Sequence, residues 1–195
     1  MRIDKVTVAD NNVWLVGDDQ RVVIVDASHD APAILAAAGG RKIDGIVCTH
    51  GHTGHVNAAI ALADASAAPV ALHPADRPLW DALHPGRPPD IELGHGDVLQ
   101  MGGTLLQVWH SPGHSPGSVC LHLAEAGVLF SGDTLRKGGP GPAGEPPGDF
   151  ATLIESLRRL LLYIPPATVV HPGHGGSTTV ADESPHVDEW TRRRR

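Results

Sequence analysis

Three things are scarce in this sequence: cysteine, long apolar runs and positive charge. Only two of the 195 residues are cysteines, and Cys48 and Cys120 both fall within apolar, strand-like runs. A scaffold held together by disulfides is therefore excluded. No apolar run approaches the roughly 18 residues that a membrane-spanning helix needs. The first residues also lack the apolar segment of a signal peptide.

The charge balance narrows the class further. The chain has 22 acidic and 15 basic residues, which gives a net charge of −7. Proteins that bind duplex nucleic acid normally carry a basic face, so this balance argues against such a partner. The length and the 41% of hydrophobic residues suit one folded domain. We expect a single cytoplasmic domain over residues 1–195, with no membrane partner and a solvated arginine-rich tail at 191–195.

Apolar patterning predicts strands in two groups, each accompanied by helices. Strands are expected at residues 3–8, 13–16, 21–26, 43–48 and 70–72, and then at 97–101, 104–109, 117–123, 127–131 and 169–170. Helices are expected at 30–38, 54–66, 75–83, 149–162 and 183–191. Asp30 is predicted to cap the first helix. A long loop rich in glycine and proline, at 136–148, is typical of functional loops. Two β-rich halves covered by helices favour an α/β sandwich.

Histidine is present in excess, with 13 residues in the chain. Because histidine is the commonest metal ligand, this excess points to a metal site. Three histidines, His50, His52 and His55, directly follow the predicted strand at 43–48. Alternate residues of an extended segment face the same way, so His50 and His52 can address one metal ion. His55 follows where the chain turns into a helix, and it would address a neighbouring point.

Three further segments each place one possible ligand near the end of a predicted strand. His114 lies in a loop between two strands, Asp133 ends a strand, and His174 follows the last strand. Each of these residues is preceded by a glycine, which lets the backbone approach a bound ion closely. Ligands on strand ends are expected to converge on one edge of the sandwich.

The order of these motifs, over nearly the whole chain, resembles the metallo-β-lactamase superfamily, and more narrowly its glyoxalase II-like hydrolases. The segment 110–118, His-Ser-Pro-Gly-His-Ser-Pro-Gly-Ser, is an especially close match to the thioesterase-like members. The resemblance implies an αββα sandwich of two mixed β-sheets flanked by helices. It also implies one or two metal ions at one edge, usually zinc and sometimes iron or manganese. Asp26 resembles the buried acid that braces the histidine loop in this family.

The same resemblance assigns metal ligands residue by residue. It implies that His50, His52 and His114 hold a first metal. It implies that Asp133 bridges the two metals, and that the second metal is held by His55 and His174. The family signature His-x-His-x-Asp-His, however, has glycine here in place of its aspartate, at Gly54. That aspartate normally binds the second metal. Three ligands remain, which is still enough for zinc, so one metal and two metals are both open.

The resemblance implies hydrolysis of a small thioester or ester by a metal-activated hydroxide that Asp133, as the catalytic residue, orients. One alternative is a mononuclear-iron persulfide dioxygenase that uses His50, His114 and Asp133. Another is a degenerate member that binds metal without catalysis. Full-length glyoxalase II enzymes bind glutathione partly through a C-terminal helical domain, and this chain ends shortly after His174. Whether the thioester contains glutathione or another thiol therefore stays open. So do the substrate and the oligomeric state.

Two basic residues follow Asp133 closely. Arg136 and Lys137 are interpreted either as attracting an acidic substrate or as part of a solvated turn.

Overall fold

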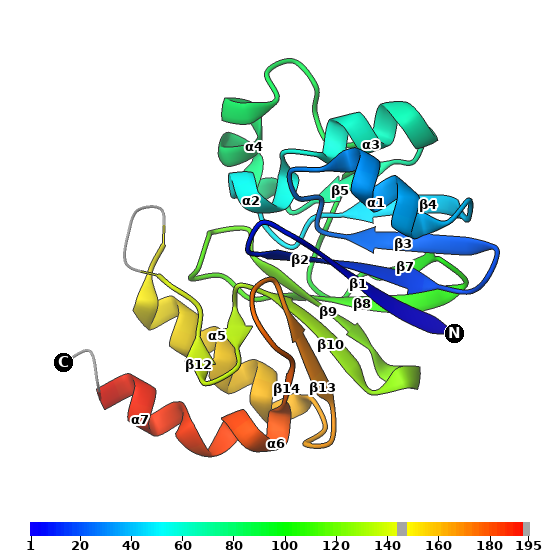
Figure 1. Cartoon of the computed structure of the whole chain (residues 1–195). Helices are drawn as coiled ribbons and strands as arrows, with labels where there is room; N and C mark the ends of the chain where they lie inside the picture. The colour runs from blue at the N-terminus through cyan, green and yellow to red at the C-terminus, as the bar shows by residue number, and fades with distance from the viewer. Residues whose placement is uncertain (144–147, 193–195) are drawn as a thin grey trace.

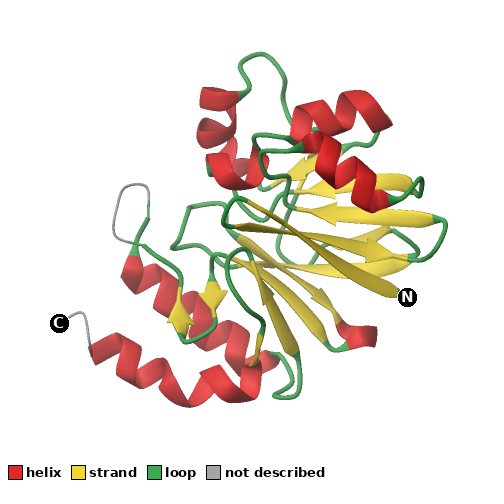
Figure 2. Ribbon diagram, viewed as in Figure 1, coloured by secondary structure: helices red, strands yellow, loops and turns green. Residues whose placement is uncertain are grey.

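The computed structural model describes residues 1–143 and 148–192 and has four layers, with helices on the outer faces of two stacked β-sheets (Figure 1; Figure 2). Each sheet has six strands and contains both parallel and antiparallel pairs. The predicted αββα sandwich of mixed sheets is therefore confirmed.

The first sheet begins with antiparallel strands and continues with parallel ones. Its strands, in spatial order, are β1 (Arg2–Val8), β2 (Asn11–Gly17), β3 (Arg21–Val25), β4 (Lys42–Val47), β5 (Val70–Leu72) and β6 (Ile91–Glu92). The pairs from β3 to β6 are parallel, so the carboxyl ends of these strands lie at the same edge.

The second sheet contains one parallel pair. Its strands, in spatial order, are β14 (Thr178–Thr179), β13 (Val169–Pro172), β10 (Val128–Gly132), β9 (Val119–Leu123), β8 (Thr104–His110) and β7 (Val98–Met101). β10 and β13 run parallel, so they too end at a common edge. The predicted loop at 136–148 contains part of a short antiparallel pair, β11 (Leu135–Arg136) and β12 (Gly139–Pro140). Its residues 144–147 lie outside the described part of the chain.

Helices cover both outer faces of the sandwich (Figure 1). Those over the first sheet are α1 (Ala31–Ala38), α2 (Thr53–Val56), α3 (Ala59–Ser66) and α4 (Arg77–Leu83), and those over the second are α5 (Phe150–Tyr163), α6 (Val180–Glu183) and α7 (Val187–Arg192). Asp30 caps α1 as predicted, because its side chain accepts a hydrogen bond from the Ala33 N–H. None of the helices in the described ranges combines the length and apolar character that crossing a bilayer requires.

Two predicted helices differ from the structure. The single helix expected at 54–66 is wrong, because the chain breaks it into α2 and α3. The break occurs where the Ala58 N–H donates to the Ala27 carbonyl, outside the helix. The helix expected at 183–191 is likewise divided, into α6, a 3₁₀ turn at Ser184–His186 and α7. Of the predicted tail, residues 191 and 192 belong to α7, and residues 193–195 lie outside the described part.

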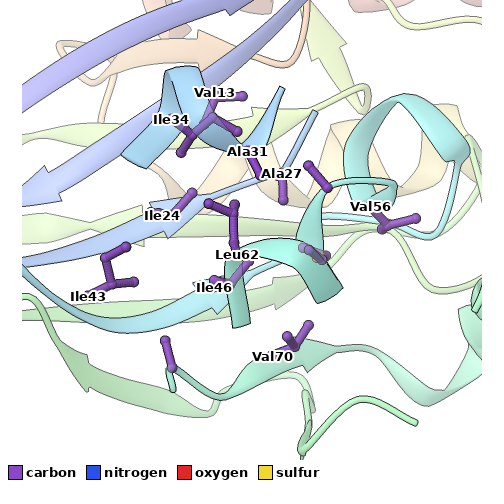
Figure 3. Packing of buried hydrophobic residues seen from close by; sticks show 14 of the residues in the cluster. Val13, Ile24, Ala27, Ala31, Ile34, Ile43, Ile46, Val56, Leu62 and Val70 are labelled. Carbon is purple, nitrogen blue, oxygen red and sulfur yellow. The ribbon is translucent and has the colours of Figure 1, made fainter. Parts of the chain in front are cut away.

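Side chains that alternate along the central strands fill two different cores. In β3, Ile24 packs beneath the helices of the first sheet (Figure 3). Val22 belongs to the same cluster, whereas Val23 and Val25 face the second sheet. A third cluster, which includes Leu129, fills the space between the second sheet and α5 and α7. Because both faces of these strands are buried, their sequences are nearly continuous apolar runs rather than alternating ones.

Candidate metal centre

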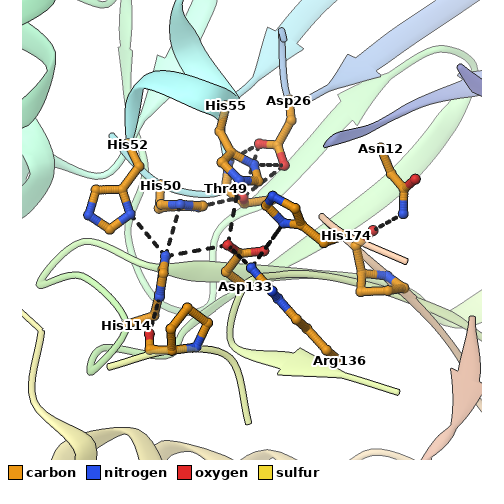
Figure 4. A network of polar contacts seen from close by, with 12 residues as sticks. Asn12, Asp26, Thr49, His50, His52, His55, His114, Asp133, Arg136 and His174 are labelled. Carbon is orange, nitrogen blue, oxygen red and sulfur yellow. Dashed lines mark hydrogen bonds and ion pairs between the residues drawn. The ribbon is translucent and has the colours of Figure 1, made fainter. Parts of the chain in front are cut away.

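The predicted ligands lie at the edge of the sandwich where the parallel strands end (Figure 4). His50, His52 and His55 follow β4, and Asp133 follows β10. His174 follows β13, and His114 lies in the loop between β8 and β9. The two parallel registers carry their strand ends to this edge, so residues distant in sequence meet there.

Three imidazoles of this set converge on one point. The Nδ1 atom of His52 lies 2.9 Å from Nε2 of His114, and Nε2 of His50 lies 3.1 Å from that same atom. Zinc–nitrogen bonds of about 2.0–2.1 Å in a tetrahedral site place two ligand nitrogens about 3.3 Å apart. A divalent ion therefore fits this group of three donors, which are buried or half-buried.

The other nitrogen of two of these rings is occupied, which fixes the tautomer. Nδ1–H of His114 donates to the Pro142 carbonyl, and Nδ1 of His50 lies 3.1 Å from the Thr49 hydroxyl. That hydroxyl donates in turn to Asp26. Nε2 of His50 and of His114 is then left without a proton and directed at the common point. Such partners orient metal ligands and raise their basicity.

Burial also favours the ligand form of the three imidazoles. It lowers the pKa of His50, His52 and His114, and for the fully buried His50 it does so strongly. The rings are consequently neutral near pH 7, and a neutral imidazole is the form that binds a metal.

A second group consists of His50, His55 and Asp133, all of them buried. Oδ2 of Asp133 lies 3.6 Å from Nε2 of His55, in its own group, and 3.6 Å from Nε2 of His114, in the first group. This carboxylate therefore links the two groups. Burial disfavours its charge, but hydrogen bonds from His174 and His55 hold the pKa of Asp133 well below its usual range. The carboxylate is therefore ionised at neutral pH.

Asp26 braces the histidine loop, as the resemblance implied. Its carboxylate accepts hydrogen bonds from the Thr49 N–H at 2.8 Å and from Nδ1–H of His55 at 2.8 Å. Burial opposes the charge on His55, but Asp26 and Asp133 outweigh burial and raise the pKa of His55 to about 10. A metal ion at Nε2 of His55 has to displace that proton. Asp26 adopts a φ of +64°, a conformation that non-glycine residues adopt rarely and that clusters at functional sites.

His174 lies beside Asp133 but outside both groups of possible ligands in the described chain. Its Nδ1 is 2.8 Å from Oδ1 of Asp133 and 3.0 Å from Nη2 of Arg136. Arg136 also donates from Nη2 to Oδ2 of Asp133, at 2.6 Å. The interpretation of Arg136 as part of a solvated turn is therefore wrong, because this side chain reaches into the centre.

Sequence reasoning missed Asp76, which has no exposed surface. Its carboxylate accepts hydrogen bonds from the Gly51 N–H at 2.7 Å, the Ser115 hydroxyl at 2.7 Å and the Gly117 N–H at 2.6 Å. It thereby joins the loop that carries His50 and His52 to the loop that carries His114. No local motif marks this residue, since its three partners lie 25 to 41 residues away.

We expect Asp76→Ala to lower the free energy of unfolding by about 3 kcal/mol or more, because three buried donors lose their acceptor at about 1–3 kcal/mol each. Urea unfolding followed by circular dichroism measures this loss. Asp81→Ala in α4, the helix that follows Asp76, is the matched control. Asp81 forms an exposed ion pair with Arg77, and such a pair contributes at most about 0.5 kcal/mol. Equal losses in the two variants would contradict the role given to Asp76.

Neither cysteine has the properties of a nucleophile. Cys48 and Cys120 are free and buried. Burial raises the pKa of the Cys48 thiol well above its usual value and that of Cys120 to about 11. Both thiols are therefore protonated and unreactive at neutral pH.

Sequence comparison places this site in a known context. The profile of the metallo-β-lactamase superfamily matches residues 6–174. The chain is 34% identical over 185 residues to an uncharacterized protein of Aquifex aeolicus, with 88% of each protein covered. It is 30% identical over 199 residues to the hydroxyacylglutathione hydrolase GloC of Haemophilus influenzae, with 94% of each covered. It is 37% identical to a hydroxyacylglutathione hydrolase of Rhodobacter capsulatus over 168 residues, which are 85% of this chain and 62% of that one.

Solved structures share the same architecture. The structure of BLEG-1 B3 metallo-β-lactamase matches with a TM-score of 0.86 at 30% identity, over 97% of this chain and 100% of that one. TTHA1623 in a di-iron-bound form matches with a TM-score of 0.82 at 35% identity, over 93% and 96% of the two chains. ETHE1 from Myxococcus xanthus matches with a TM-score of 0.78 at 25% identity, over 93% and 81%.

Proposed function

The chain belongs to the metallo-β-lactamase superfamily, and on that basis we propose that it is a metal-dependent hydrolase of a small thioester or ester. One observation carries the proposal: three neutral imidazoles converge on one point, with nitrogens of His52 and His50 at 2.9 and 3.1 Å from Nε2 of His114, next to an ionised carboxylate. Relatives named hydroxyacylglutathione hydrolase support the thioester class. One of them matches this chain over 94% of its length, so a hydroxyacyl-glutathione thioester is the first substrate to test.

A divalent metal bound at this point would lower the pKa of a bound water to about 7 and would polarise a carbonyl group. The residues of the chain supply the rest. His50, His52 and His114 would hold the ion, and the Thr49 hydroxyl and the Pro142 carbonyl, by pairing with Nδ1 of His50 and of His114, keep the Nε2 atoms of these two rings free of protons. Asp133, ionised and within 3.6 Å of His114, is placed to accept a hydrogen bond from the attacking water and so to orient it.

The proposal is tested with protein that has been stripped of metal and reloaded with zinc or iron. Zinc-loaded protein should hydrolyse a hydroxyacyl-glutathione thioester, followed by release of the free thiol. Asp133→Asn should lower kcat/KM by more than about 100-fold, beyond what the loss of a ligand's hydrogen-bond partner costs. The oxygen ester of the same acyl group and a β-lactam complete the panel. If the loaded wild type were no faster than Asp133→Asn on all three, hydrolase activity of this kind would be ruled out.

A mononuclear-iron persulfide dioxygenase is the second candidate. The observation that favours it is Gly54, which stands where the family has the aspartate of the second metal position. His50, His114 and Asp133 still lie together. Two histidines and one carboxylate form the facial triad of non-haem iron oxygenases. Oxygen uptake by iron-loaded protein with a persulfide, together with no thioester hydrolysis by the zinc form, would establish this candidate in place of the first.

A further inference from the structure

We propose that the guanidinium of Arg136 takes the place of a second metal ion between Asp133 and His174, so that this centre binds one ion. The inference rests on the metal centre of the proposed function. A protein 35% identical to this chain has been crystallised in a di-iron-bound form, so a single ion would be a property of this chain's own residues.

The position of Arg136 is the first argument. Its Nη2 lies 2.6 Å from Oδ2 of Asp133 and 3.0 Å from Nδ1 of His174. A guanidinium is always charged and only donates hydrogen bonds, so its natural partners here are a carboxylate oxygen and a ring nitrogen lone pair. A cation lying between Oδ2 of Asp133 and Nδ1 of His174 would need the same two atoms. The side chain of Asp133 is 5% exposed and that of Arg136 is 30% exposed, so the pair is screened less at its carboxylate end than an ion pair on the open surface.

Nδ1 of His174 also shows that the position is crowded. That single nitrogen lies 2.8 Å from Oδ1 of Asp133 as well as 3.0 Å from Arg136. It can donate to the carboxylate or accept from the guanidinium, but it cannot do both at once. Either arrangement occupies Nδ1, so an ion could use only the other ring nitrogen of His174, Nε2.

The surroundings of Gly54 are the second argument. A Cβ atom at this position would lie 2.8 Å from Oδ1 and 3.3 Å from Cγ of Asn11. The Asn11 carboxamide thus occupies the space that an aspartate at 54 would enter. Asn11 is 7% exposed, so its carboxamide is held within the packed interior beside Gly54. The carboxamide is neutral and supplies none of the negative charge that an aspartate at 54 would bring.

The two differences act in the same direction. Glycine at 54 removes one negative charge from the second position, and arginine at 136 adds one positive charge to it. Each disfavours a divalent cation there, and neither touches the group of His50, His52 and His114. The residues of the second position therefore do not fit a second ion.

The test counts metal ions per chain by elemental mass spectrometry, after reloading with excess zinc and gel filtration. Wild type should hold about one ion, and Arg136→Leu, which leaves His55, His174 and Asp133 available, should hold more, because three protein ligands suffice for zinc. Gly54→Asp with Arg136→Leu should hold about two ions. Gly54→Asp alone should stay near one, because the guanidinium remains. Arg136→Lys keeps a positive charge and should also stay near one.

Arg87→Leu is the matched control for loss of an arginine, because the ion pair of Arg87 with Asp64 is exposed and includes none of the possible metal ligands. It should hold the same number of ions as wild type. Two ions in the wild type, or one ion in every variant, would overturn the inference. One ion without turnover of any substrate would overturn only the proposed function. No ion in the wild type would overturn the metal centre and this inference with it.

Discussion

Replacing His114 by alanine is expected to abolish both metal binding and hydrolysis. Its Nε2 is the atom that faces His50 and His52 at 3.1 and 2.9 Å, and it is also 3.6 Å from Asp133. Removing a group that hydrogen-bonds to a metal ligand lowers metal affinity or activity by about 10–100-fold. Removing the ligand His114 itself should therefore lower the zinc affinity and the activity by at least about 1,000-fold. Competitive zinc titration measures the affinity, and thioester turnover at saturating zinc measures the activity.

His122→Ala provides the control for His114→Ala. His122 is a buried histidine of β9, and it belongs to neither group of possible ligands in the described residues. Its replacement should leave the zinc affinity unchanged even if it lowers the melting temperature. If His114→Ala retained zinc as tightly as His122→Ala, the centre described above would not be the metal site.

Replacing Gly113 by alanine is expected to destabilise the fold by about 3 kcal/mol or more, since it combines backbone strain with overpacking. Gly113 has a φ of +132°, and a Cβ atom there would lie 2.2 Å from the backbone nitrogen of Leu153 and 2.3 Å from its Cα. The obstacle is the backbone of α5, which cannot rotate away as a side chain would. Urea unfolding followed by tryptophan fluorescence gives the loss.

Gly127→Ala separates the two causes. Gly127 also has a positive φ, of +61°, but a Cβ atom there would meet nothing within 4 Å. Its replacement should cost only the backbone term, about 1 kcal/mol. A loss for Gly113→Ala no larger than that for Gly127→Ala would mean that α5 accommodates the methyl group. In that case His114, the next residue, would not be displaced either.

Local pattern in the sequence was enough to locate most of the secondary structure. The apolar runs of β3, β5, β9 and β10 are nearly continuous because both sheet faces are buried there, and buried strands of this kind are visible without knowledge of the fold. The start of α1 was predicted from Asp30, whose capping chemistry is local. The break between α2 and α3 was missed because a hydrogen bond to Ala27, which is distant in sequence, produces it.

The identity of the possible ligands was also fixed by sequence. His50, His52, His114 and Asp133 stand at strand ends, and parallel strands carry their ends to one edge whatever the details of packing. Gly54 was equally plain, because an absent carboxylate can be read directly. These conclusions depend on residue type and on order along the chain, which the sequence contains in full.

What surrounds those ligands was decided only by the tertiary structure. Asp76 joins two loops that are far apart in the chain, Asn11 fills the space beside Gly54, and Arg136 lies against Asp133 and His174. Apart from the Arg136–Asp133 pair, these contacts join residues separated by more than 20 positions, and their lengths are set by how the two sheets stack. Such contacts leave no periodicity or spacing in the sequence. The residues that could hold a metal were therefore predictable from the sequence, but the number of ions that they bind was not, because it depends on the packing around them.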